Sequence, residues 1–270
     1  MTGAHIRRLS VLQNFSNHAD QYDGYAIVQE RVVDRLLQLL KPSLPPSGAI
    51  LDVGCGTAKL GRLLQAASPK APLFLCDIAH GMTLQARKNM PNALTLDADA
   101  GDLPFRSGIF SLVCSSSALQ WVSDLERAFC EAGRVLAPGG LFAFALFGEN
   151  TLFELKRSYT EAHREVGGSH SSHLQVFPGE DAVRNALCWV NWGRLEVFTE
   201  YEIEYHRDVV HLLRALKGIG AQNASTDRPA GLASRRLMNR MIDCYGEKFG
   251  GSGGIPATYQ VIYGLAVKER

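Results

Sequence analysis

Hydrophobic residues recur in two spacings along the first 147 residues of the chain. Short apolar runs fit buried strands, and segments with apolar residues at steps of three and four fit helices between them. This alternation predicts a parallel sheet with right-handed helical crossovers. The predicted strands are Ala49–Val53, Leu73–Cys76, Ala93–Leu96, Ile109–Ser115 and Leu141–Phe147, and the predicted helices are 24–41, 60–66, 82–88 and 125–136. A Pro138-Gly139-Gly140 turn should end the last helix and begin the fifth strand.

The pattern changes after residue 148. A helical segment over 152–165 leads into a Gly/Ser/His loop at 167–173. Apolar residues then alternate with charged ones from Val197 to Tyr205, and a last strand, 259–267, follows a glycine-rich tract. These two strands predict an antiparallel pair that completes a mixed, mostly parallel seven-stranded sheet. We expect an N-terminal helical cap over 1–48, a ligand-binding core over 49–147, and helical insertions plus the last strands over 148–270.

Composition excludes several classes of protein. With 46% hydrophobic and 20% charged residues, the 270-residue chain is typical of a globular protein. Its formal net charge of +1 is too low for a general nucleic-acid binder. No apolar run approaches the roughly 20 residues of a membrane helix, and the first residues do not resemble a signal peptide. Six scattered cysteines without a C-x-x-C pair agree with a cytoplasmic protein, which we expect to be a monomer.

One stretch combines a buried strand, a glycine turn and the start of a helix. It reads Asp52-Val53-Gly54-Cys55-Gly56. The two glycines let a ligand approach the backbone closely, and the following helix offers unpaired N–H groups. A turn of this kind serves either a dinucleotide or S-adenosyl-L-methionine (SAM).

Two residues separate these ligands. A dinucleotide fingerprint needs a glycine three positions after Gly56, where this chain has Lys59. Asp52 would repel the pyrophosphate of a dinucleotide, whereas it would attract the ammonium and sulfonium groups of SAM. The charge of Asp52 therefore favours SAM.

Acidic residues follow the next two predicted strands. Asp77 lies about twenty residues after Gly56, where an acid binds both ribose hydroxyls of a nucleoside. Both ligand classes use this device, so Asp77 indicates a nucleoside without distinguishing them. We expect Asp99, after the third strand, to accept a hydrogen bond from an adenine amine.

These motifs, with Asp102-Leu103-Pro104-Phe105 and Arg134-Val135-Leu136 before the Pro-Gly-Gly turn, resemble class I SAM-dependent methyltransferases over about 50–147. The resemblance implies a Rossmann-like α/β fold and SAM as cofactor. The usual third glycine of the first motif is Ala58 here. The cofactor-binding residues that we expect are Asp52, Gly54, Cys55, Gly56, Asp77, Ile78, Met82, Asp99, Ala100 and Ser115.

Further segments resemble one methyltransferase family along nearly the whole chain. They are Phe15-x-x-x-Ala19-x-x-Tyr22, Ala118-Leu119-Gln120-Trp121, Phe177-Pro178, Leu216-Lys217-Gly218-Ile219-Gly220-Ala221 and Pro256-x-Thr258-Tyr259. Together they resemble the malonyl-[acyl-carrier protein] O-methyltransferases of biotin synthesis, known as BioC. The resemblance implies methylation of the free carboxyl of a malonyl thioester carried on acyl-carrier protein.

A malonyl carboxylate is already ionised at pH 7, so methyl transfer to it requires no general base. Positioning of the carboxylate and exclusion of water should supply the catalysis. We expect Tyr22 and Lys217 to act as catalytic groups, Tyr22 by orienting the anion and Lys217 by steering the malonyl group or its phosphopantetheine arm. Gln120, Trp121 and Phe177 are the expected substrate-binding residues.

Charge is uneven in the last third of the chain. Lys and Arg outnumber Asp and Glu between His206 and Arg240. Such a patch would steer an acidic acyl-carrier protein toward the enzyme. Arg235, Arg236 and Arg240, on one predicted helix, are the expected partner contacts. His170 and His173 have metal-ligand spacing but no acidic or thiolate partner, so we predict no metal site.

Three other functions remain open at this point. One is an O- or C-methyltransferase for a small free carboxylic acid or another metabolite. Another is a non-catalytic module with a SAM fold, although intact Asp52, Gly54, Gly56 and Asp77 argue against loss of the cofactor site. A dehydrogenase is the third possibility, which Lys59 and Asp52 weaken.

Overall fold

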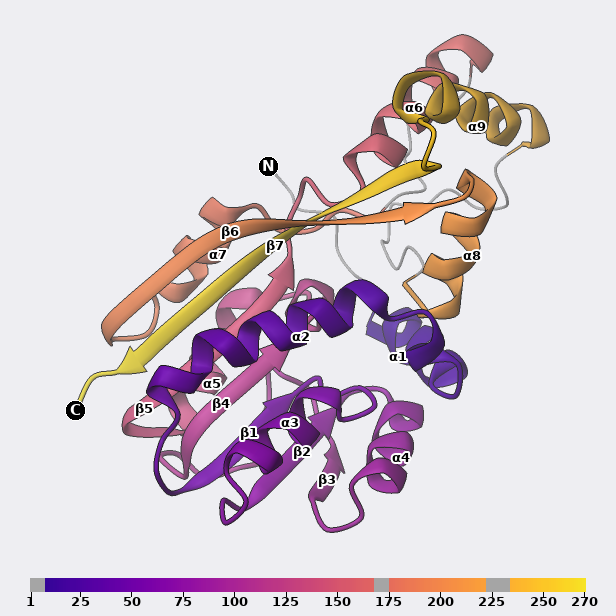
Figure 1. Ribbon diagram of the computed structural model, residues 1–270. Coiled ribbons are helices and arrows are strands. Elements are labelled where there is room, and N and C mark those ends of the chain that lie inside the picture. Colours follow the sequence, from indigo (N-terminus) through magenta and orange to yellow (C-terminus); the bar gives the residue numbers. More distant parts are fainter. Residues whose placement is uncertain (1–7, 168–174, 222–233) are drawn as a thin grey trace.

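The computed structural model describes residues 8–167, 175–221 and 234–270. Within these ranges the chain forms a seven-stranded sheet with the order β3-β2-β1-β4-β5-β7-β6 (Figure 1). The first five strands are parallel, and β7 runs antiparallel to both β5 and β6, as predicted. The strands are β1 Ala49–Val53, β2 Leu73–Asp77, β3 Leu94–Asp97, β4 Phe110–Ser116, β5 Leu136–Phe147, β6 Trp192–His206 and β7 Ile255–Lys268.

The start of β5 differs from the prediction. The strand begins at Leu136, and its pairing with β4 shifts register between Phe110–Leu136 and Leu112–Leu141. The Pro138-Gly139-Gly140 segment therefore lies within an interrupted strand and is not a turn that precedes it. Proline cannot donate a ladder hydrogen bond and Gly139 has a φ of +75°, so the pairing breaks at this segment.

Helices cover both faces of the sheet (Figure 1). On one face, α2, α3 and α4 bury a core that includes Val32, Leu36 and Leu64. On the other face, α5 and α7 pack on a second core around Phe129, Phe142 and Leu187. The bounds are α2 Ile27–Leu40, α3 Lys59–Ala67, α4 His80–Asn89, α5 Leu125–Val135 and α7 Glu180–Leu187.

The remaining helices lie beyond the carboxyl ends of the parallel strands. They are α1 Arg8–His18, α6 Phe153–Val166, α8 Val209–Gly218 and α9 Arg235–Phe249, and α6 packs along α9 (Figure 1). Helix α1 was not predicted; it docks on α4, where the Gly81 N–H donates to Ser16 Oγ at 3.2 Å. A Cβ on Gly81 would overlap the Ser16 backbone, so this glycine permits the close approach. None of the described helices is long and apolar enough to cross a bilayer.

Candidate active site

The turn after β1 exposes its backbone to a cavity. Gly54 and Gly56 have φ values of +70° and +52°, and Ala58, with a φ of +68°, caps α3 in the same left-handed region. A Cβ on Gly54 would overlap the Ala118 methyl, whereas no atom lies within 4 Å of a Cβ built on Gly56. A side chain at position 56 would therefore project into open space, which glycine leaves free for a ligand.

Asp77 is held at the end of β2 by the backbone. Its two carboxylate oxygens accept hydrogen bonds from the N–H groups of Gly56, at 3.0 Å, and Ala79, at 2.8 Å. Burial raises the pKa of Asp77 to about 6, although these two N–H groups act to lower it. The carboxylate is therefore rigidly aimed, and a positive or hydrogen-bond-donating ligand would stabilise its ionised form.

Asp52 is the less satisfied of the two carboxyls. It is 1% exposed, and its Oδ2 has no hydrogen-bond partner among the residues that the structure describes. Burial, and secondly the charge of Asp77, raise the pKa of Asp52 to about 7. A buried acceptor without a partner destabilises a protein unless a ligand supplies the missing donor.

Three cavities meet at these residues. The Asp77 cavity, of about 110 Å³, contains Gly54, Gly56 and Asp77 in its wall. The Asp52 cavity, of about 50 Å³, lies between the glycine turn and the start of α2. The lysine cavity, of about 280 Å³, lies under α6 and α8. Tyr22, in the short 3-10 turn before α2, lines all three and so marks their junction.

Aromatic rings form the partition between the Asp77 cavity and the lysine cavity. Trp121 lines both cavities and contacts Phe15 of α1 edge-on, with ring centroids 5.4 Å apart. On the lysine-cavity side, Phe177 contacts Trp121 edge-on at 5.3 Å. These apolar rings exclude water from the junction next to Tyr22.

The cavities differ in charge. Acidic side chains predominate around the Asp77 and Asp52 cavities, where the charged lining residues are Asp23, Glu30, Asp52, Asp77, Asp99, Arg8 and Lys59. Among the described residues that line the lysine cavity, the charged ones are Lys156 and Lys217. The site therefore suits a cationic ligand on one side of Tyr22 and an anionic ligand on the other.

Most of the predicted cofactor residues come together. Gly54, Gly56, Asp77, Ile78, Met82, Asp99 and Ala100 line the Asp77 cavity, and Asp52 and Cys55 line the Asp52 cavity. Ser115 does not line any of these cavities: it is fully buried within β4, and its Oγ has no partner. Ser116 and Ser117, missed in the sequence, line the Asp77 cavity instead, because the strand extends one residue further than predicted.

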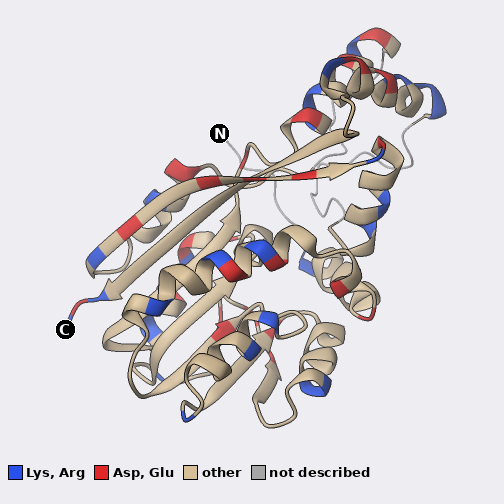
Figure 2. Ribbon diagram, in the orientation of Figure 1, with Lys and Arg blue, Asp and Glu red and all other residues tan. Residues whose placement is uncertain are grey.

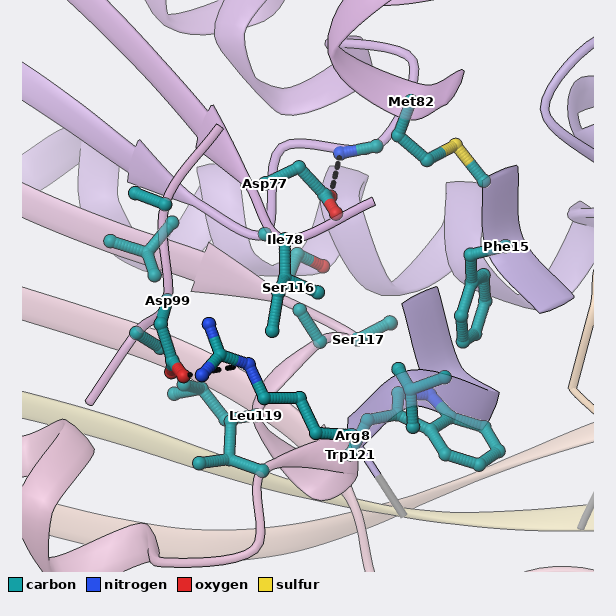
Figure 3. A pocket seen from close by; sticks show the side chains of 18 of the residues that line it. Arg8, Phe15, Asp77, Ile78, Met82, Asp99, Ser116, Ser117, Leu119 and Trp121 are labelled. Atoms are coloured by element: carbon teal, nitrogen blue, oxygen red, sulfur yellow. Dashed lines mark hydrogen bonds and ion pairs between the residues drawn. The ribbon is translucent and has the colours of Figure 1, made fainter. Parts of the chain in front are cut away.

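Asp99 already has a cationic partner. Arg8 Nε lies 3.2 Å from Asp99 Oδ2, and the guanidinium extends across the cavity wall (Figure 3). The other carboxylate oxygen accepts the Gly101 N–H at 2.9 Å. An adenine amine at Asp99 would therefore share this carboxylate with Arg8, which the sequence pattern did not indicate.

The four predicted acceptor-side residues line the lysine cavity: Gln120, Trp121, Phe177 and Lys217. The Gln120 amide is engaged by the fold, because its Nε2 donates to Ser117 O at 2.7 Å and its Oε1 accepts the Phe147 N–H at 3.4 Å. Lys217 is exposed at the end of α8. Lys156, missed in the sequence, is half-buried on α6.

The predicted partner contacts divide into two groups. Arg235 and Arg236 are exposed in the first turn of α9. Figure 2 shows the blue of basic residues at the beginning of this helix. Arg240 is instead paired with Glu165 at 2.5 Å and Glu247 at 3.1 Å, so its charge is neutralised by α6 and by its own helix. The net positive charge of this surface is therefore smaller than the count of basic residues along the sequence indicates.

Metal ligands can be assessed for the described residues. Glu161, Glu165 and Cys244 lie close together, but Lys248 and Arg240 form ion pairs with the two glutamates. These protein cations neutralise the cluster. The predicted pair His170 and His173 lies outside the described residues.

Comparisons with known proteins agree with this geometry. Residues 51–144 match the family described as "Methyltransferase domain". A "Malonyl-[acyl-carrier protein] O-methyltransferase" of Geobacter sulfurreducens is 48% identical, covering 96% of this chain and 98% of that protein. A protein of the same name from Methylococcus capsulatus is 34% identical, covering 94% and 92%.

A "Biotin biosynthesis bifunctional protein BioHC" of Saccharophagus degradans is 32% identical over 93% of this chain and 45% of its own length. Among solved structures, a putative methyltransferase of Bacillus halodurans has a TM-score of 0.59 at 16% identity, covering 88% of this chain and 99% of that one. This structural likeness shows the fold. From its sequence relatives and its fold, the chain belongs to the malonyl-[acyl-carrier protein] O-methyltransferase family of class I SAM-dependent methyltransferases.

Proposed function

We propose that this protein transfers a methyl group from SAM to the free carboxylate of a malonyl group on the phosphopantetheine arm of acyl-carrier protein. The observation that carries the proposal is the charge difference across Tyr22. Acidic cavities lie on one side and the lysine cavity lies on the other. A cationic donor and an anionic acceptor would thus meet at the junction.

The residues around the acidic cavities fit SAM. Among the described residues, Asp52 Oδ2 has no donor, and the ammonium group would supply one. Asp77, held by two backbone N–H groups, would accept from the ribose hydroxyls, and the open position at Gly56 leaves room for the ligand beside the turn. When bound, SAM supplies a methyl carbon on a positively charged sulfur, which departs with the C–S bonding electrons.

The acceptor carboxylate would enter from the lysine cavity. One of its oxygens forms the new C–O bond as the C–S bond breaks, so a cation and an anion become two neutral groups and no proton moves. Tyr22, which lines all three cavities, would orient the carboxylate. Burial, then Asp77 and Asp23, raise the pKa of its phenol, which therefore stays protonated and able to donate a hydrogen bond at neutral pH.

The remaining work is positioning and exclusion of water. The reacting oxygen must lie about 3–3.5 Å from the methyl carbon in line with the C–S bond. Trp121, Phe15 and Phe177 supply the apolar wall around this point. Neutral hydrogen-bond donors and an apolar lining that excludes water suit this reaction, because a cation bound tightly to the attacking oxygen would lower its nucleophilicity.

The acceptor is tested directly with labelled SAM. Malonyl-acyl-carrier protein, malonyl-CoA and free dicarboxylic acids are supplied in separate reactions, and base-labile methyl ester is measured. We expect the highest kcat/KM with the carrier protein. Turnover confined to free acids would contradict the carrier-protein substrate and favour a methyltransferase for small metabolites. No calorimetric signal with SAM or S-adenosylhomocysteine would contradict a methyltransferase altogether.

A further inference from the structure

Lys156 is an unusual group for an apolar cavity. It lies near the start of α6, and its Nζ donates to the Glu149 carbonyl at 2.6 Å. The same ammonium lies 6.0 Å from the Phe177 ring centroid. Burial lowers the pKa of Lys156, because the side chain has lost part of its hydration. Of its three N–H donors, the carbonyl uses one.

None of the described residues that line this cavity is acidic; the Glu149 carboxylate, outside the lining, is the charge that partly offsets that of Lys156. Aromatic and aliphatic side chains form most of this lining: Phe15, Trp121, Phe147, Leu152, Leu155, Phe177, Leu213, Leu216, Ile219 and Tyr259. The other charged lining residue is Lys217, which is also a cation. A partly desolvated ammonium in such a cavity is stabilised when an anion joins it.

Position separates the two lysines. Phe177 connects Lys156 to Trp121, which borders the Asp77 cavity, through contacts of 6.0 and 5.3 Å. Lys217 is exposed at the end of α8, on the solvent side. An acyl group on a long carrier arm must enter with its free end first, so the free carboxylate reaches the inner cation and the phosphate of the arm stays near the outer one.

We propose that Lys156 is a positioning residue that binds the free carboxylate of the acceptor, while Lys217 contacts the phosphate of the phosphopantetheine arm. This assignment rests on the proposed function and names the group that recognises its substrate. One carboxylate oxygen pairs with Lys156 Nζ, and the second oxygen remains free to face the methyl group beside Tyr22. Acyl groups without a terminal carboxylate would bring no anion to Lys156 inside the cavity and bind more weakly.

Binding to protein saturated with S-adenosylhomocysteine, which cannot react, tests the assignment. The probes are malonyl- and acetyl-phosphopantetheine, which differ in the carboxylate, and malonyl-pantetheine, which lacks the phosphate. We expect the wild type to prefer malonyl over acetyl by about tenfold or more. In Lys156→Gln this ratio should fall to near one while acetyl-phosphopantetheine binds as before. Lys217→Gln should keep the ratio but lose the preference for the phosphorylated arm.

The outcomes are distinct. If Lys156→Gln keeps the wild-type ratio of malonyl to acetyl affinity, the assignment is overturned. Equal weakening of both acyl ligands would also overturn it, because it indicates a structural role for Lys156. If only Lys217→Gln loses the preference for malonyl, Lys217 and not Lys156 binds the carboxylate, and the assignment is overturned. Methyl transfer by the wild type to malonyl-acyl-carrier protein is measured separately. The wild type could transfer no methyl group and still prefer malonyl over acetyl, with Lys156→Gln losing that preference. This result would reject the proposed function and leave the carboxylate site standing.

Discussion

Replacing Asp52 by Asn should stabilise the folded protein while it damages the cofactor site. The side chain is buried and its Oδ2 has no partner in the described structure. Asn has nearly the same shape but carries no charge, so the substitution removes the electrostatic cost and little of the packing. The gain should depend on pH, because it exists only where the native Asp is ionised.

The magnitude follows from the pKa. Burial raises the pKa of Asp52 from 3.8 to about 7. One pKa unit corresponds to about 1.4 kcal/mol, so ionised Asp52 destabilises the folded state by on the order of 4 kcal/mol. Because the folded pKa lies above the unfolded one, stability falls as pH rises from about 4 to about 7 and the loss is complete above pH 7.

Urea unfolding at pH 5, 6, 7 and 8 measures this effect. We expect Asp52→Asn to have the higher free energy of unfolding, by an amount that grows to pH 7 and then stays constant. Exposed Asp34→Asn is the matched control and should follow the wild type. If Asp52→Asn is no more stable than the wild type at pH 8, the carboxylate is not buried without compensation and the reasoning fails.

Three further predictions test the site. Gly56→Ala should fold, with a small loss of Tm from its φ of +52°, but bind S-adenosylhomocysteine weakly in calorimetry, because its methyl enters the cavity. Gly54→Ala should lose more Tm, because it adds overlap with Ala118 to a φ of +70°. Wild-type affinity in Gly56→Ala would contradict a ligand beside this turn. Tyr22→Phe should keep the affinity for S-adenosylhomocysteine and slow methyl transfer by about tenfold. Tyr25→Phe, outside the cavities, is the control, and wild-type turnover in Tyr22→Phe would exclude a role of Tyr22 in methyl transfer. Replacement of both Arg235 and Arg236 by Glu should raise the KM for the carrier protein, most at low salt, and leave the KM for malonyl-pantetheine unchanged. Arg240→Glu should instead lower Tm, since Glu165 and Glu247 lose their partner; equal losses with both substrates in the double variant would argue against docking.

Features set by local chemistry were predictable from the sequence. Strand–helix alternation indicated the parallel sheet, because its apolar spacing is local. The Gly54 turn with Asp77 indicated a nucleoside site, because the acid follows the turn at the usual step of about twenty residues. Helix α1 was missed because Val11 is its one buried residue and its position depends on docking to α4. The error at Ser115 has a similarly small cause: one residue at a strand end decides which side chain faces the cavity.

Long-range pairing was not predictable. Lys156 looks like an ordinary solvated lysine on a helix, and only the packing of α6 against α9 and β7 brings it into a cavity. The neutralisation of Arg240 depends on Glu165, which is 75 residues away in the chain. Asp99 likewise meets Arg8, which lies in the first described helix, far away in the chain. Such contacts depend on tertiary structure, which periodicity does not encode.

The opposite charges on the two sides of Tyr22 bear on turnover as well as on recognition. The acceptor is attracted to the lysine cavity by a carboxylate charge that the reaction cancels, so the enzyme binds the acyl group more weakly once the ester has formed, whereas the ammonium group of the donor keeps its charge. Product dissociation would then be driven by the chemical step itself. We expect the ester to be a poor inhibitor compared with its parent acid, and expulsion of the neutral acyl chain to free the cavity for the next carrier protein.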